Sequence, residues 1–408
     1  MSVLISPIVR LYINKRIANG LEDSSRKTER FGIPSKSRPD GSLIWIHAVS
    51  VGETISVLPL IDEFKKQNKN LHVLLTTTTL TAARMIEERC GTSVIHQFIP
   101  FDVSTWGRRF VKYWRPKAVF FVESELWPNI LHILHEASIP AYMLNARVTS
   151  STLKRMYMVQ KIFKIAPYSL FRNVYVPTNA MRRHVQELGA RDSIVIPNLK
   201  MLAPPLPVDE PQSKRLARKI GKRKVWIAVS THLTEDNIIY AVHKKLKERH
   251  HDVLTILAIR HPARVADVIA ACLNAGLTSA CYTETITNAK QITEDIYILD
   301  KLGCLGNFFS VVDTVFVCGS LVPGIGGHNF LEPIKFSCNV ATGEFIENFN
   351  DIYEHVAQWC KKLRSTGEIT QFVLDSFANF SREARVAQPI DYESKWSEVV
   401  RSISEAVL

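Results

Sequence analysis

An acidic residue that could move a proton follows an apolar run near the start of the chain. The run Leu43–Val49 leads into Ser50-Val51-Gly52-Glu53, and a glycine before an acid at a strand-to-helix turn lets the backbone bend and present the carboxylate. Glu53 could then act as a general base for an incoming hydroxyl group. Ser50-x-x-Glu53 is also a capping-box pattern, in which the glutamate satisfies amides at a helix start. Spacing alone favours the cap, because capping boxes far outnumber catalytic acids.

A second acidic group, Glu123-Ser124-Glu125, comes directly after the run Ala118–Val122. Its two carboxylates could hold the hydroxyls of an acceptor or a cation, or could stand at a helix start because the helix dipole favours negative charge there. Arg147 follows the next apolar run and could bind a carboxylate or phosphate through two parallel hydrogen bonds. A surface ion pair is the alternative interpretation of Arg147.

The second half of the chain carries groups that suit an anion. Ser230-Thr231-His232 and Arg260-His261-Pro262 each follow an apolar run, and hydroxyls beside a guanidinium suit a phosphate or carboxylate. His232 and His261 could also be metal ligands, but no third ligand stands at a suggestive spacing, so we expect no metal site.

The glycine-rich segment Gly319–Pro333 is the strongest local signal. It follows the run Thr314–Val317 and is expected to open a helix at about Asn329. Glycines let backbone amides approach an anion, and a helix start adds the positive end of a dipole. The segment matches neither the P-loop nor the Gly-x-Gly-x-x-Gly fingerprint. It predicts a phosphate-binding loop with Glu332 placed to contact a ribose. The alternative is a flexible loop with a dipole-favoured glutamate.

Apolar runs that alternate with amphipathic stretches must position these groups, and they predict parallel sheets in an α/β fold. The runs are Leu43–Val49, His72–Leu75, Ala118–Val122, Ala141–Leu144, Val174–Val176, Val225–Val229, Val253–Ile259, Ile296–Leu299 and Thr314–Val317. We predict an N-terminal segment over 1–39, α/β domains over 40–200 and 223–385, a proline-rich extended linker over 201–222 and a helical tail over 386–408. Because ligands of open sheets bind at the carboxyl ends of strands, we expect a cleft between the domains.

Composition indicates a folded chain with an anionic partner. The 408 residues are 46% apolar and carry a net charge of +12, of which the first 39 residues hold +5. This charge suits a membrane or nucleic acid, but no nucleic-acid-binding motif is present. The N-terminus predicts an interfacial segment, or else a first helix that packs on the protein. Its apolar residues are Leu4, Ile5, Ile8, Leu11 and Tyr12, and its basic residues are Arg10, Lys15 and Arg16. Seven scattered cysteines without a Cys-x-x-Cys pair predict reduced thiols.

These segments, taken in order, resemble the 3-deoxy-D-manno-octulosonic acid (Kdo) transferases of lipid A biosynthesis. The resemblance runs from about residue 8 to residue 360. The matching segments are Trp45–Glu53, Thr76–Thr79, Pro100–Asp102, Glu123–Asn129, Asn145–Arg147, Asn198–Lys200, Ser230–His232, Arg260–Pro262 and Gly326–Pro333. One such motif is weak, but nine in the expected order are specific.

The resemblance implies a GT-B glycosyltransferase of two Rossmann-like domains, with CMP-Kdo as donor, lipid IVA as acceptor, inversion at the anomeric carbon, no cofactor and no required metal. It implies Glu53 as the base, Glu123 or Glu125 as a second acid, and Ser50, Gly52 and Arg147 on the acceptor side. The implied CMP site is Ser230, Thr231, Arg260, His261, Pro262, Gly326, Gly327, His328, Asn329 and Glu332. The implied location is the cytoplasmic face of the cell inner membrane. A nucleotide-sugar 2-epimerase and a non-catalytic peripheral membrane protein are the alternatives.

Overall fold

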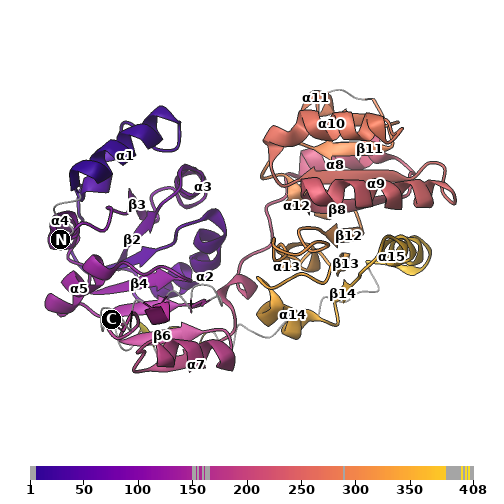
Figure 1. Ribbon diagram of the computed structural model, residues 1–408. Helices are drawn as coiled ribbons and strands as arrows, with labels where there is room; N and C mark the ends of the chain where they lie inside the picture. Colours follow the sequence, from indigo (N-terminus) through magenta and orange to yellow (C-terminus); the bar gives the residue numbers. More distant parts are fainter. Residues whose placement is uncertain are drawn as a thin grey trace. The chain divides into compact units, whose positions relative to one another are not determined.

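The chain forms two units, each built on its own sheet (Figure 1). The computed structural model describes residues 6–148, 153, 156–158, 160, 166–287, 290–382, 397, 400, 401, 403 and 404. The first unit comprises Met1–Pro204 and Ile390–Leu408, and the second comprises Pro205–Pro389. The chain therefore leaves the first unit and returns to it near its end.

The strands of the first unit all pair in parallel, in the order β3-β2-β1-β4-β5-β6-β7 among the described residues. β1 lies between β2 and β4, with Ile44 opposite Val73 on one side and Ala118 on the other. Their carboxyl ends consequently share one edge of the sheet. The strands are β1 (Leu43–His47), β2 (His72–Thr77), β3 (Ile95–Phe98), β4 (Ala118–Val122), β5 (Ala141–Leu144), β6 (Asn173–Val176) and β7 (Ser193–Val195).

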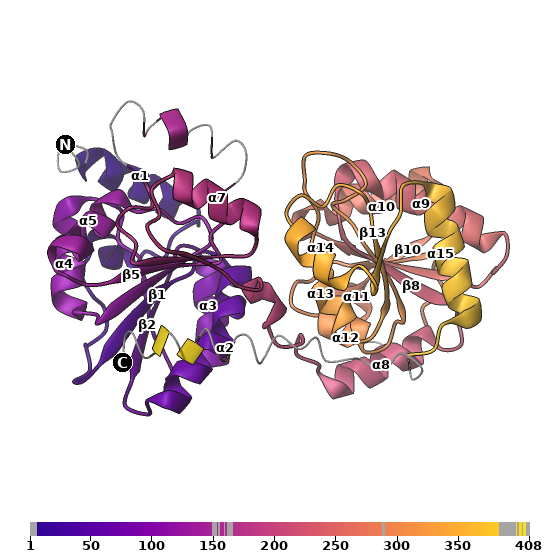
Figure 2. The same ribbon diagram turned by 90° about the horizontal axis from the view of Figure 1, so that it is seen from below.

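Helices cover both faces of this sheet because successive strand residues point to opposite sides. Trp45 packs in a cluster with α4 and α5, whereas Ile44 packs in a cluster with α2 and α3. Figure 2 shows these two pairs of helices on opposite sides of the sheet. Val400 and Ile403, near the end of the chain, are buried in the second of these clusters. The helices are α1 (Ser6–Ala18), η1 (Lys27–Phe31), α2 (Val51–Gln67), α3 (Leu80–Cys90), α4 (Ser104–Trp114), α5 (Pro128–Glu136), α7 (Asn179–Glu187) and η2 (Leu199–Met201).

The second unit repeats this plan, with parallel strands in the order β10-β11-β9-β8-β12-β13-β14. Its first strand in the chain, β8, lies between β9 and β12 as β1 lies between β2 and β4. The strands are β8 (Val225–Thr231), β9 (Leu254–Ile259), β10 (Ser279–Cys281), β11 (Ile296–Leu299), β12 (Thr314–Val317), β13 (Asn339–Thr342) and β14 (Cys360–Lys362). The helices are α8 (Glu210–Ile220), α9 (Leu233–Lys247), η3 (Pro262–Arg264), α10 (Val265–Asn274), α11 (Tyr282–Thr285), α12 (Leu305–Phe309), α13 (Leu331–Ile334), α14 (Asn350–Val356) and α15 (Thr366–Asn379).

The prediction of an extended linker over 201–222 was wrong for its second half, because residues 210–220 form α8. Asp209 caps this helix by accepting the N–H of Gln212, and Pro211 stands in the first turn, where its missing N–H costs nothing. Leu216 and Ile220 are buried, so packing holds the helix in place. Most of the predicted tail over 386–408 lies outside the described residues.

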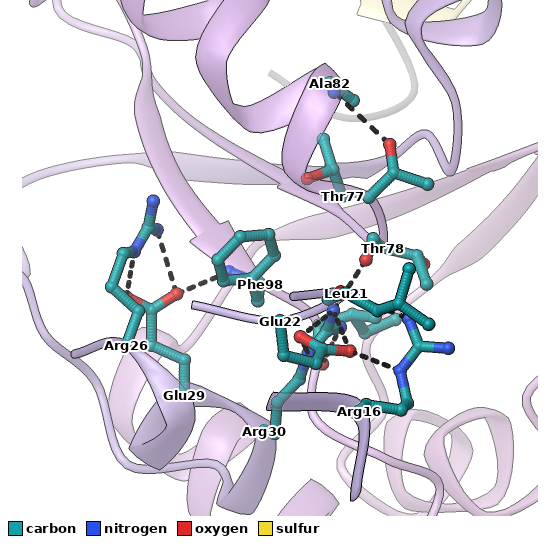
Figure 3. Close-up of polar contacts among 12 residues, drawn as sticks. Arg16, Leu21, Glu22, Arg26, Glu29, Arg30, Thr77, Thr78, Ala82 and Phe98 are labelled. Atoms are coloured by element: carbon teal, nitrogen blue, oxygen red, sulfur yellow. Dashed lines mark hydrogen bonds and ion pairs between the residues drawn. The ribbon is translucent and has the colours of Figure 1, made fainter. Parts of the chain in front are cut away.

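The N-terminal segment is tied to the first sheet by arginines that pair inside the protein (Figure 3). Glu22 accepts hydrogen bonds from both Arg16 and Arg30, and the Arg30 and Glu22 side chains are each only 3% exposed. Arg30 also donates to the carbonyls of Thr78 and Ile99, just beyond the ends of β2 and β3. The charge of Arg16, which the interfacial interpretation places against lipid headgroups, is thus paired with Glu22.

Replacing Glu22 with alanine should lower the free energy of unfolding of the first unit by about 3–5 kcal/mol, because Arg30 then stays buried without its anion. Denaturant unfolding followed by tryptophan fluorescence measures this change. Glu63→Ala is the matched control, since it breaks an exposed pair with Lys66 on α2 and should cost less than about 1 kcal/mol. Equal losses in the two variants would contradict the buried-pair argument.

Candidate active site

Glu53 lies in the first turn of α2, at the carboxyl edge of the first sheet. Ser50 is the N-cap, and its hydroxyl accepts the N–H of Glu53 at 3.3 Å. The Glu53 carboxylate accepts the Val49 N–H and the Ser50 hydroxyl, each at 2.8 Å. The N-cap at Ser50 is therefore confirmed, but the glutamate accepts the N–H of Val49 and not that of Ser50, as a full capping box would require. This arrangement leaves the proton chemistry open, because a carboxylate with two donors retains acceptor capacity.

Burial, together with the charges of Glu123 and Glu125, raises the pKa of Glu53 to about 7, against the lowering effect of the hydrogen bonds from Val49 and Ser50. A carboxyl group with this pKa changes its protonation state near neutral pH, as a general base must. The predicted bending role of Gly52 was wrong. Gly52 lies in α2 with a φ that any residue adopts, and a Cβ there would meet nothing within 4 Å.

The turn after β4 brings Glu123 and Glu125 to the same edge. Glu123 has a left-handed φ of 62°, a strained conformation for a residue other than glycine, and its carboxylate pairs with the Lys200 ammonium at 2.6 Å. Glu125 accepts the indole N–H of Trp127 at 2.9 Å. The start of α2, the turn after β4 and the short helix η2 therefore meet at one acidic site, in which Lys200 supplies a positive charge.

Arg147 and His47 also lie at the carboxyl edge of the first sheet. Arg147 follows β5, and its backbone N–H donates to the carbonyl of Glu123 while its carbonyl accepts the Ser124 hydroxyl. His47 ends β1 and is fully buried, with Nε2 lying 3.7 Å from a Glu125 carboxylate oxygen and Nδ1 3.0 Å from the Thr76 hydroxyl. Reasoning from the sequence missed His47, although a polar residue at the end of an apolar strand was a signal.

In the second unit, the carboxyl end of β8 and the loop after β9 carry the predicted anion-binding groups. Ser230 has a left-handed φ of 60°, and the Arg260 N–H donates to the carbonyl of Thr231 at 3.2 Å. Arg260 and His261 are exposed at the carboxyl edge, and Pro262 begins η3 directly after them. The structure therefore brings the predicted residues at the end of β8 and those after β9 together.

Three histidines meet beside Arg260. The rings of His232 and His328 stack with centroids 5.1 Å apart, and His232 and His261 meet edge to face at 5.8 Å. Burial lowers the pKa of His328 to about 4 and also lowers the pKa of His232, so both imidazoles are neutral at pH 7. Among the residues that the structure describes, no group of three or more His, Cys, Asp or Glu side chains could hold a metal ion.

The glycine-rich loop differs at both ends from the predicted phosphate-binding loop. The amides of Gly319, Ser320 and Leu321 donate to the carboxylate of Glu235 at 2.7–3.0 Å, so these amides do not face a ligand phosphate. The helix expected from Asn329 is the four-residue α13, Leu331–Ile334, which carries little dipole. Sequence reasoning missed Glu235, although His232-x-x-Glu235 repeats the spacing of Ser50-x-x-Glu53.

Gly326, Gly327, Asn329 and Glu332 lie in the second half of this loop. A Cβ on Gly326 would stand 2.4 Å from the Asn348 amide nitrogen, and Gly326 and Gly327 have φ values of 86° and 83°, so side chains are excluded there. Asn329 donates to Glu332 at 3.1 Å, and burial raises the pKa of Glu332 to about 7. Glu332 is therefore a half-buried carboxyl group that can accept or donate a hydrogen bond near neutral pH.

Two parallel α/β units with polar loops at the carboxyl edges of their sheets define a GT-B glycosyltransferase fold, as predicted. A solved glycosyltransferase from Rickettsia africae matches with a TM-score of 0.60 over 90% of this chain and 98% of that one. The two sequences are 11% identical, so this similarity supports a shared fold and nothing further. The family model "3-Deoxy-D-manno-octulosonic-acid transferase (kdotransferase)" matches residues 25–203.

Relatives identify the family. The Arabidopsis thaliana protein "Probable 3-deoxy-D-manno-octulosonic acid transferase, mitochondrial" is 33% identical over 87% of this chain and 80% of its own length. The 3-deoxy-D-manno-octulosonic acid transferase of Rickettsia felis is 32% identical over 83% of this chain and 71% of its own length. The chain belongs to the Kdo transferase family and is a glycosyltransferase, which confirms the resemblance found in the sequence.

Replacing Glu53 with glutamine should stabilise the protein selectively at high pH. A folded-state pKa of about 7 lies above the ordinary value of 4.5 for this carboxyl group, so the folded state binds this proton more tightly and loses stability as pH rises through 7. Glutamine cannot ionise and escapes that loss. Between about pH 5 and about pH 9 the stability of Glu53→Gln relative to the wild type should rise by about 1–3 kcal/mol, as read from urea unfolding.

Proposed function

We propose that the protein transfers Kdo from CMP-Kdo to lipid IVA, a lipid A precursor, in lipopolysaccharide biosynthesis, with inversion and with Glu53 as general base. The observation that carries this proposal is the pKa of Glu53, which burial and two neighbouring acids raise to about 7 at the carboxyl edge of the sheet. Family membership supports the transferred sugar. In this proposal the first unit binds the acceptor and the second binds the donor.

Glu53 acts on the acceptor hydroxyl. As this hydroxyl oxygen forms a bond to the anomeric carbon of Kdo, its proton passes to Glu53. The bond from that carbon to the CMP phosphate breaks on the opposite face, and CMP leaves with the electron pair. The Val49 N–H and the Ser50 hydroxyl hold the carboxylate in one orientation, so the base is positioned before the acceptor arrives.

Basic and hydroxyl groups stabilise the two substrates. Arg260 is exposed beside His261, and in this proposal its guanidinium stabilises the negative charge that develops on the departing phosphate. Glu332 is the proposed partner of the CMP ribose. On the acceptor side Lys200 offsets part of the charge of Glu123, which lets a phosphorylated glycolipid approach an acidic site.

The proposed membrane contact is one face of α1. Ile8, Leu11 and Tyr12 are 67%, 70% and 49% exposed, and helical spacing places them on one side with Lys15. Leu4 and Ile5, predicted to join them, lie outside the described residues. Among the described residues no helix is both long and apolar enough to cross a bilayer. We propose peripheral attachment to an anionic surface, the cytoplasmic face of the inner membrane.

Incubation of the purified protein with CMP-Kdo and lipid IVA, read by mass spectrometry, should show a mass gain of one or more Kdo residues. Glu53→Gln should lower kcat by about 10²–10⁴-fold, and the wild-type rate should rise with pH up to about 7 and then level. Glu63→Gln, on the same helix but in an ion pair with Lys66, should keep wild-type activity. A wild type without product would overturn the proposed reaction, and an active Glu53→Gln would overturn the assignment of the base.

Changing Ile8, Leu11 and Tyr12 together to serine should weaken partitioning onto phosphatidylglycerol vesicles by about tenfold or more, because each apolar side chain contributes on the order of 1 kcal/mol or more on burial. Vesicle sedimentation measures the change. The control changes Ile269 and Leu273, exposed apolar residues of α10, to serine. Unchanged binding in the α1 variant, or an equal loss in the control, would remove the α1 contact.

A further inference from the structure

Glu235 is a fully buried carboxylate that the proposed chemistry does not use. It is the third residue of α9, whose N-cap is His232. One carboxylate oxygen accepts the N–H groups of Ser320 at 3.0 Å and Leu321 at 2.9 Å, and the other accepts the N–H of Gly319 at 2.7 Å. A carboxylate at a helix start therefore reaches across to the loop after β12.

Three successive amides that converge on one anion form a backbone nest, the geometry by which loops bind phosphate. Here the resident anion is a side chain of the protein. The nest is filled whether or not a ligand is present, because Glu235 is 0% exposed and its oxygens are already bonded. These three amides consequently fix the course of the loop and cannot also bind a donor phosphate.

The same turn also contacts the far end of the loop. His232, the N-cap of α9, stacks on His328, with their Nε2 atoms 2.8 Å apart. The Gly327 N–H donates to the Gly319 carbonyl at 2.8 Å and closes the loop between these two contacts. Residues 232–235 therefore hold both ends of the segment 319–328.

We propose that Glu235 is a positioning residue for the donor site: it fixes the shape of the loop that contacts the nucleotide without touching the nucleotide itself. This inference rests on the proposed function, in which the second unit binds CMP-Kdo. It follows that loss of the contacts between Glu235 and the three amides weakens binding of the donor and of CMP, whereas binding of the acceptor in the first unit is unchanged.

Glu235→Gln tests this role, because an amide keeps one acceptor oxygen and turns an NH₂ group towards amides that need acceptors. Amide exchange of residues 318–328 and the Kd for CMP should each rise by about tenfold or more, since a buried N–H loses its partner. The KM for the donor should rise similarly, while kcat and the KM for the acceptor stay within about twofold. Glu368→Gln is the matched control. Glu368 is also the third residue of a helix, α15, but is exposed and accepts the N–H of Arg364.

The outcomes separate this inference from the proposed function. A wild type that does not bind CMP overturns the donor assignment, and with it the role of Glu235 in donor binding. Wild-type binding of CMP together with unchanged CMP affinity in Glu235→Gln overturns the positioning role alone. If circular dichroism shows that Glu235→Gln does not fold, Glu235→Asp tests the inference instead, because aspartate keeps the negative charge on a shorter side chain. A folded Glu235→Asp with wild-type CMP affinity overturns the inference, and a raised Kd supports it.

Discussion

The parallel pairing of every strand in each sheet is the constraint on which the rest of this structure depends. A parallel sheet is covered on both faces, so the middles of its strands are largely apolar and polar groups gather at the strand ends. Parallel pairing brings all carboxyl ends to one edge. Glu53, Glu123 and Arg147 follow three adjacent strands, β1, β4 and β5, and therefore meet although about a hundred residues separate the first from the last.

The two units use one local device for two purposes. Glu53 and Glu235 each stand at the third position of the helix that follows the first strand of their unit. Glu235 is enclosed by backbone amides of another loop and acts as a structural anion. Glu53 receives only one amide and one hydroxyl, and its burial and two neighbouring acids raise its pKa to about 7. The surroundings, and not the position on the helix, therefore decide whether such a carboxylate holds a neighbouring loop or can take up a proton near neutral pH.

The sequence could predict features that depend on neighbouring residues, but not contacts between residues far apart in the chain. The apolar runs predicted nine strands correctly, because burial on both faces leaves a continuous apolar signal. The strands β3, β7, β10, β13 and β14 were missed, since they have three or four residues each and several carry polar side chains. Capping at Ser50 was predictable because it is local. The partner of Glu235 was not, since residue 320 lies 85 positions away and only the packing of β8 against β12 brings it close.

The charge of the N-terminus shows why composition alone misleads about a surface. Arg16 and Arg30 share Glu22, Arg26 pairs with Glu29, and Arg10 lies over the Phe31 ring, so these charges serve the fold first. A paired arginine attracts lipid headgroups weakly, because its field is cancelled nearby. Each free basic residue adds about 1 kcal/mol at an anionic surface, whereas a fully buried apolar side chain adds about 1.5–3 kcal/mol. In the proposed membrane contact, the exposed apolar face of α1 therefore contributes more than the net charge of the segment, and added salt should weaken the contact only in part.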